Sequence, residues 1–98
     1  MTMTNFLQNF RKYNYMDYSS DNYGAHSIAI ELNNKTFYFS DDTLVAFGGY
    51  DKKGNYYECC IKNYWGSTTG KHLNAIEPNK EKRLDSKEFE KQLKLFLK

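Results

Sequence analysis

The sequence predicts an α+β fold, a four-stranded antiparallel meander sheet with N- and C-terminal helices packed on one face. Two observations carry this prediction. Apolar and polar residues alternate through successive segments between residues 27 and 64, as in half-buried strands. Near both ends of the chain, apolar residues recur instead at helical spacing. With 98 residues, the chain is expected to form a single domain, 1–98.

The first helix is predicted over residues 4–13. Thr4 is a suitable N-cap, and the apolar residues that follow at helical spacing are Phe6, Leu7, Phe10 and Tyr13. Residues 14–26 are polar and rich in tyrosine, which is typical of a loop.

The sheet is predicted over residues 27–64, and its clearest part is a hairpin. Residues 27–32 and 35–40 flank Asn33-Asn34, and asparagine tolerates the positive φ of a type I′ turn. This register pairs Ile30 with Phe37 on one face. The opposite face then receives Ala29, Glu31, Thr36 and Tyr38.

Two further strands are predicted at residues 43–50 and 55–64. Alternation in the last strand directs Cys59 to the interior and Cys60 to solvent. Adjacent cysteines on a strand point to opposite faces, so they cannot form a disulfide that cross-links the fold. No signal peptide follows Met1. We therefore expect a reduced protein in the cytoplasm of a bacterial host cell.

The remaining segments are a loop with a short helix at 65–78 and a helix at 85–97. Thr68 or Thr69 is the expected cap of the short helix, which Pro78 ends. Asp85 and Glu88 have capping-box spacing. The apolar stripe of the last helix is Phe89, Leu93, Phe96 and Leu97.

The composition of the chain argues against several classes of function. A net charge of +2 is neither the strong basic excess of a nonspecific DNA binder nor the acidity of a DNA mimic. A mean hydropathy of −0.83, without an apolar run of about 18 residues, excludes a membrane-spanning helix. Aromatic residues make up 17% of the chain and nine of them are tyrosines, which favours half-exposed, interface-forming surfaces.

The segment from residue 63 to 74 holds most of the candidate binding residues. They are Tyr64, Trp65, Thr68, Thr69, Lys71 and His72. A phosphate-binding P-loop needs four residues between its glycines and a Ser or Thr after the lysine. Here three residues separate Gly66 from Gly70, and His72 follows Lys71, so nucleotide hydrolysis is not indicated. An anion held at a helix N-terminus and a purely structural turn both remain open.

No cofactor or metal is expected, and no catalytic residue is assigned. The two histidines and two cysteines lack metal-ligand spacing. Cys60, the cysteine expected in solvent, has no identifiable activating neighbour in the sequence. We therefore expect a protein that is not an enzyme.

Outward-facing aromatic residues complete the candidate site. Tyr38 and Tyr56 join Tyr64 and Trp65, and interleaved lysines would suit single-stranded nucleic acid. Arginine is nearly absent, however, and protein interfaces favour tyrosine with fewer demands on charge. Protein binding is therefore the first prediction, and self-association stays open.

Two motifs resemble a group of small phage and mobile-element proteins, mostly of unassigned function. The first is Ser-x-x-Thr-x-Val-Ala, here Ser40 to Ala46; the second is Trp-Gly-x-Thr-Thr-Gly-Lys-His, here Trp65 to His72. The resemblance implies a phage-type accessory protein that binds a host protein or defence complex, as an anti-CRISPR-like inhibitor does. The alternative is a single-stranded nucleic-acid or nucleotide-binding module that uses the Trp65–Lys71 loop.

Overall fold

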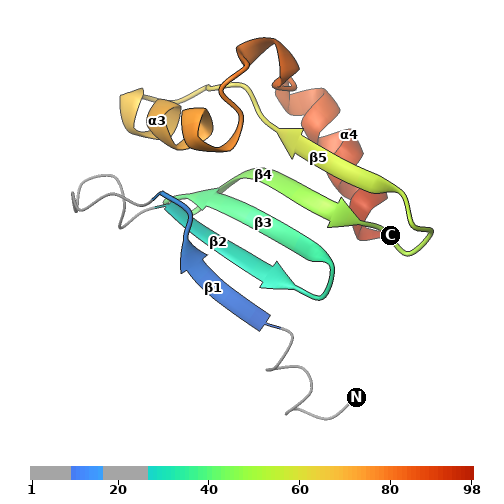
Figure 1. The fold of residues 1–98 in the computed structure, drawn as a ribbon. Helices are drawn as coiled ribbons and strands as arrows, with labels where there is room; N and C mark the ends of the chain where they lie inside the picture. The colour runs from blue at the N-terminus through green and yellow to red at the C-terminus, as the bar shows by residue number, and fades with distance from the viewer. Residues whose placement is uncertain (1–9, 17–26) are drawn as a thin grey trace.

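The structure is a computed structural model that describes residues 10–16 and 27–98. Five antiparallel strands form one sheet in the order β1-β2-β3-β4-β5, so each strand pairs with its neighbour in sequence (Figure 1). The elements are β1 (Phe10–Asn14), β2 (Ser27–Leu32), β3 (Lys35–Ser40), β4 (Thr43–Tyr50), β5 (Tyr56–Cys60), α3 (Ser67–Ile76), the 3₁₀ turn η1 (Lys80–Lys82) and α4 (Ser86–Leu97).

The sheet has five strands where the sequence predicted four. The additional strand is β1, which occupies the end of the helix predicted at 4–13; the rest of that helix lies outside the described residues. Lys12 pairs with Ile30 and Tyr13 with Ala29 in regular antiparallel register. The helical spacing rests on only a few apolar residues. The hydrogen bonds that this segment makes with the free edge of β2 outweigh that local helix preference.

The register of β2 and β3 is the predicted one. Ile30 pairs with Phe37, and Ala29 pairs with Tyr38. The turn between these strands is not type I′, because among its two asparagines only Asn33 has a positive φ, at 59°. A type I′ turn would need positive φ at both positions.

A β-bulge interrupts the pairing of β3 with β4. Tyr38 pairs with Ala46 and Phe39 with Leu44, which leaves Val45 as the extra residue on β4. Its carbonyl instead accepts a hydrogen bond from the backbone N–H of Ile61, at 2.9 Å. The bulge thereby helps to fix the chain that leaves β5.

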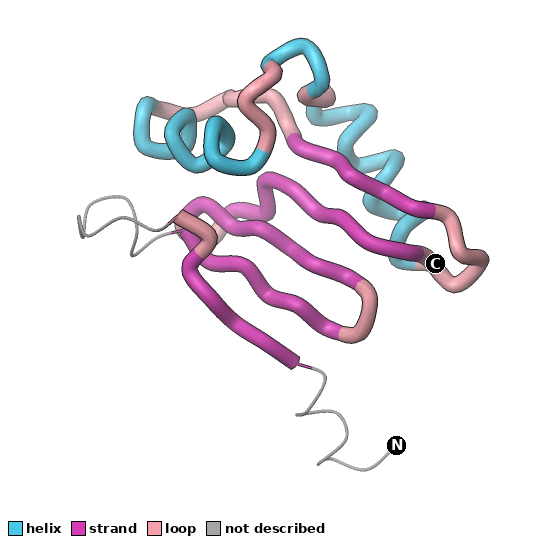
Figure 2. The backbone as a smooth tube through the Cα atoms, viewed as in Figure 1, coloured by secondary structure: helices cyan, strands magenta, loops and turns pink. Residues whose placement is uncertain are grey.

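The two helices lie on opposite faces of the sheet. Of the two terminal helices predicted to share one face, the described residues contain only α4, and the short helix α3 covers the opposite face. We call one side the α4 face, and its central row is Ile30, Phe37, Phe47 and Cys59. The other side is the α3 face, and its central row is Ala29, Tyr38, Ala46 and Cys60. In Figures 1 and 2, α4 passes behind β5 while α3 covers only one end of the sheet.

The core under α4 is aromatic. Phe96 is fully buried, stacks on Phe47 with ring centroids 4.9 Å apart, and meets Phe37 and Tyr57 edge-on. Burying an aromatic side chain of this size contributes about 2–3 kcal/mol. The predicted capping residue is confirmed, because Asp85 accepts a hydrogen bond from the N–H of Glu88, at 2.8 Å.

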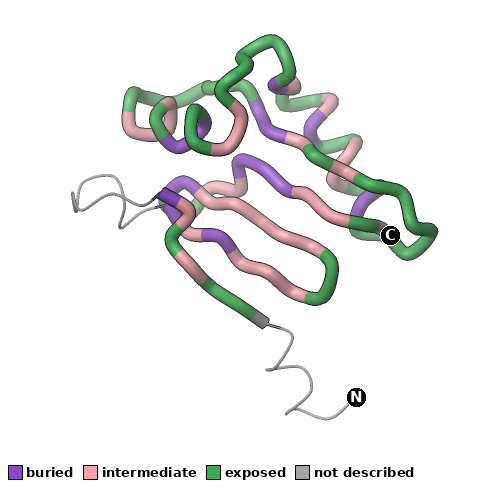
Figure 3. Tube along the Cα trace, viewed as in Figure 1, coloured by how far each residue is buried: buried purple, intermediate pink, exposed green. Residues whose placement is uncertain are grey.

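The end of the α3 face that α3 covers is also buried (Figure 3). Leu73 of α3 and Ala46 of β4 belong to one cluster with Cys60. Cys60 is therefore buried, with 5% of its surface exposed, whereas Cys59 is half-buried. The prediction of an exposed Cys60 is wrong because α3 covers this end of the sheet, which strand alternation alone does not reveal.

Of the helices that the structure describes, none is long and apolar enough to cross a membrane.

Candidate functional site

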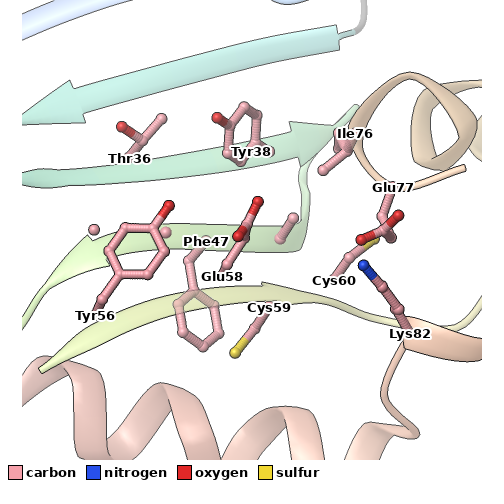
Figure 4. Close-up of a pocket in the computed structure, with 13 residues that line it drawn as sticks. Thr36, Tyr38, Phe47, Tyr56, Glu58, Cys59, Cys60, Ile76, Glu77 and Lys82 are labelled. Carbon is pink, nitrogen blue, oxygen red and sulfur yellow. The ribbon is translucent and has the colours of Figure 1, made fainter. Parts of the chain in front are cut away.

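A groove of about 360 Å³ runs over the part of the α3 face that α3 leaves uncovered (Figure 4). Small residues of β4 lie at its floor, Ala46 and Gly48. Two predicted binding residues, Tyr38 of β3 and Tyr56 of β5, line it, and Ile76 closes the end next to α3. The sheet therefore brings together two tyrosines that are separated in sequence.

The groove combines aromatic rings with polar groups. In Figure 4 the side chains of Thr36, Tyr38, Tyr56 and Glu58 lie over the same part of the sheet and line the groove. The ring of Tyr56 is 60% exposed and lies 5.1 Å from that of Tyr50, between ring centroids. Such a surface offers both apolar contact and hydrogen bonding to a ligand.

Burial raises the pKa of two side chains that line the groove, a tyrosine and a cysteine. It raises the pKa of Tyr38 to about 12, with a further contribution from the neighbouring phenol of Tyr13. Burial also raises the pKa of Cys60 to about 11, although the positive charge of Arg83 opposes this rise. Both groups are therefore protonated at neutral pH, and the Cys60 thiol is a poor nucleophile.

Two other predicted site residues, Thr69 and His72, face the sheet rather than solvent. The hydroxyl of Ser40, the last residue of β3, lies 2.6 Å from Nδ1 of His72 and 3.0 Å from the hydroxyl of Thr69. The His72 side chain is fully buried and Ser40 is 3% exposed. This polar cluster joins α3 to the sheet and is closed to a ligand.

Tyr64 and Trp65 lie on the exposed loop before α3. Their rings meet edge-on with centroids 6.0 Å apart, and they are 55% and 44% exposed. The Tyr64 hydroxyl accepts a hydrogen bond from the backbone N–H of Ser86, at 3.0 Å, so it also satisfies the first turn of α4. The indole of Trp65 is the more available of the two for binding.

The start of α3 differs from the prediction. Gly66 is the N-cap, without a side-chain hydrogen bond, so neither Thr68 nor Thr69 caps the helix. Lys71 is exposed and Thr68 half-buried. The predicted single site therefore separates into the groove, the exposed loop and the buried cluster.

No histidine is among the described residues that line the groove. His72 is bonded to Ser40 in the buried cluster, away from solvent. Within residues 10–16 and 27–98, no group of three or more His, Cys, Asp or Glu side chains is placed to hold a metal ion.

Several groove residues were not among the predicted site residues. Thr36, Glu58 and Ile76 come from three different elements, and Lys82 comes from η1. Alternation in the strands places Thr36 on the same face as Tyr38, and Glu58 on the same face as Tyr56, but it does not single them out as site residues. The contribution of Ile76 depends on where α3 docks, which no local pattern encodes.

Comparison with known proteins identifies one family. No curated protein and no solved structure matches the chain. A family model matches residues 10–91, which include all five strands and the first half of α4. The chain thus belongs to a family of unknown function, DUF8033.

Proposed function

We propose that this protein is a non-enzymatic binding protein whose groove on the α3 face receives part of a protein partner. The observation that carries this proposal is that Tyr38 and Tyr56 line the same groove, above a floor of small residues. Tyrosine is enriched at protein interfaces because it adds contact area and a hydrogen bond at low entropic cost.

The charges of the groove favour a basic side chain of the partner. Glu58 is exposed at the groove, and Glu77 lies at the end near Lys82. Glu58 has no basic side chain within 4.0 Å among the described residues, where the only such ion pair is Arg11–Glu31. An incoming lysine or arginine would pair with this carboxylate and pack on the ring of Tyr56.

The resemblance of two motifs to phage and mobile-element proteins directs the choice of partner. Those motifs meet in the fold, since Ser40 begins one and His72 ends the other. We propose a host protein of the bacterial cytoplasm, with a defence complex such as a CRISPR effector as the first candidate. A plaque assay on hosts with and without the defence system tests this choice.

The groove itself is tested by capture of partners from a bacterial host lysate. The protein and its Tyr56→Ala and Glu58→Lys variants are compared with Glu90→Lys, a control on the exposed side of α4. We expect a protein captured by the wild type to be lost with both groove variants and kept with the control. Equal capture by all four proteins would refute the assignment of the groove.

A second candidate function is the binding of single-stranded nucleic acid at the exposed loop. It is favoured by the exposed ring of Trp65 and by the nearby Lys62, because bases stack on aromatic rings while lysines contact the phosphates. Trp65 is the only tryptophan, so its fluorescence reports on this loop alone. Titration with oligonucleotides at low salt should quench it; unchanged fluorescence would remove this candidate.

A further inference from the structure

A second hollow, also of about 360 Å³, shares no residue with the groove. It lies between α3, η1 and the chain that leaves β5. Three of its lining residues are cationic and two carry amides. The full set is Lys62, Asn63, Gly70, Asn74, Lys80 and Arg83.

Arg83 is the most unusual of these residues, because it is buried without an acidic partner. Only 5% of its surface is exposed. Its Nε donates to the carbonyl of Glu77, at 3.0 Å, and its Nη2 donates to Oδ1 of Asn74, at 2.8 Å. Both acceptors are neutral. Among the described residues, no carboxylate lies within 4.0 Å of the guanidinium.

A buried charge of this kind is normally paired, because removing it from water is costly. The two hydrogen bonds use two of the five N–H donors of the guanidinium. No buried side-chain nitrogen or oxygen in the described part of the chain lacks a hydrogen-bond partner. Nη1, which makes neither of these bonds, must therefore reach solvent, and the hollow is the open space that Arg83 lines.

The other polar groups add donors and positive charge. Asn74 accepts the Arg83 bond through its oxygen, which leaves its NH₂ group as a donor at the hollow. Lys62 and Lys80 are exposed and line the same space. The backbone N–H of Lys62 donates to the carbonyl of Leu84, at 2.8 Å, so the chain carrying Lys62 is held beside Arg83.

Gly70 makes room for the Asn63 side chain at the hollow, at a cost in helix stability. It lies inside α3, where glycine is about 1 kcal/mol less favourable than alanine. A Cβ at this position would lie 3.1 Å from Nδ2 of Asn63, another residue of the hollow. A helix residue chosen against local stability to fit a neighbouring side chain is typical of a functional position.

We propose that this hollow binds the phosphate group of a small molecule. A phosphate offers the divalent charge and the several acceptor oxygens that a guanidinium and two ammonium groups recognise. It would supply the counter-charge that the fold does not give to Arg83. The proposal is independent of the partner proposed for the groove.

Two sources of phosphate are consistent with this chemistry, namely the free anion and a nucleotide. Trp65 lies on the adjoining loop, where its backbone N–H donates to Oδ1 of Asn63, at 2.8 Å. A nucleotide would place its phosphate in the hollow and reach the exposed indole with its base, whereas inorganic phosphate would leave the indole unaffected.

The test is calorimetric titration of the purified protein with sodium phosphate and with adenosine monophosphate. Sodium chloride at equal ionic strength is the control for general screening. The decisive variant is Lys62→Ala/Lys80→Ala, since both lysines are exposed and outside the core. Its matched control is Lys52→Ala/Lys53→Ala, which removes the same charge from the exposed loop between β4 and β5.

We expect binding of at least one phosphate compound that falls about tenfold or more in the decisive variant and is unchanged in its control. Amide signals of Gly70 and of the Asn63 and Asn74 side chains should shift on titration. Tighter binding of the nucleotide, with quenching of Trp65, would identify the nucleotide as the source. Equal weakening by both double variants, or no binding beyond that of chloride, would overturn the proposal.

Discussion

The hydroxyl of Ser40 and Nδ1 of His72 lie 2.6 Å apart between the last residue of β3 and the middle of α3, and both side chains are buried. This contact joins the two sequence motifs, since Ser40 begins the first and His72 ends the second. It also explains why a Lys-His pair occurs inside α3, since Lys71 is exposed while His72 is directed into the fold.

Removing this contact should destabilise the protein. In Ser40→Ala, His72 and Thr69 both lose the partner that they share. Because a buried polar group left unpaired costs about 1–3 kcal/mol, we expect a loss of that size in the free energy of unfolding. Urea denaturation measures it, with the exposed Ser67→Ala as the matched control, expected within about 0.5 kcal/mol.

The neighbouring positions of α3 separate stability from surface function. Thr69→Ala should cost about 1 kcal/mol, because it loses the hydrogen bond to Ser40 and not because it caps the helix. Lys71→Ala should stay within about 0.5 kcal/mol of the wild type, since its side chain is exposed. Thermal melts of both variants test this contrast, and a larger loss for Lys71→Ala would contradict it.

Much of the fold follows from local patterns. The strands β2, β3 and β4 have the predicted bounds, and α4 differs from its prediction by one residue at its start. These segments combine clear alternation or capping with short turns, so local and tertiary preferences agree. β1 could not be predicted in this way, because its strand conformation depends on pairing with β2.

The candidate site was harder to predict than the strands. Tyr38 and Tyr56 were identified, but their common groove exists only because α3 stops short of the middle of the sheet. His72 was assigned to a binding loop because sequence does not reveal which side of a helix docks. Nothing in the sequence indicates that Arg83 is buried, because its burial arises from the fold of η1 against α3.

The two cysteines should differ in reactivity, because their order of exposure is the reverse of the one predicted from the sequence. Cys59 is half-buried, whereas Cys60 is 5% exposed and burial raises its pKa from 9.0 to about 11. At pH 8 only about one Cys60 thiol in a thousand is then ionised. A disulfide-exchange reagent should therefore modify one thiol per chain quickly, and Cys59→Ser should abolish this fast phase.

The same shift makes stability depend on pH. The folded-state pKa of Cys60 lies above the unfolded value, so the neutral thiol is favoured by folding. Its contribution is fully present below pH 9 and is lost as the pH rises towards 11. Cys60→Ala should weaken the alkaline decline of the melting temperature between these values. An identical alkaline decline in the wild type and the variant would contradict this assignment.

Two glycines with positive φ should respond differently to the same substitution. Gly49 in β4 has φ +127°, and a Cβ there would lie 2.0 Å from the carbonyl oxygen of Asn34, which also accepts a hydrogen bond from Tyr50 N–H. Gly54, in the loop between β4 and β5, has φ +86°, and a Cβ there would meet no atom within 4 Å.

Gly49→Ala must therefore displace the β2–β3 turn, whereas Gly54→Ala meets only the backbone strain of a left-handed alanine. We expect Gly54→Ala to cost about 1–2 kcal/mol. Gly49→Ala adds a steric clash with the backbone and should cost at least about 3 kcal/mol, up to loss of folding. Urea denaturation of the two variants decides this. Equal losses would mean that the β2–β3 turn can move away from Gly49 without cost, and that the close approach of Asn34 does not require glycine.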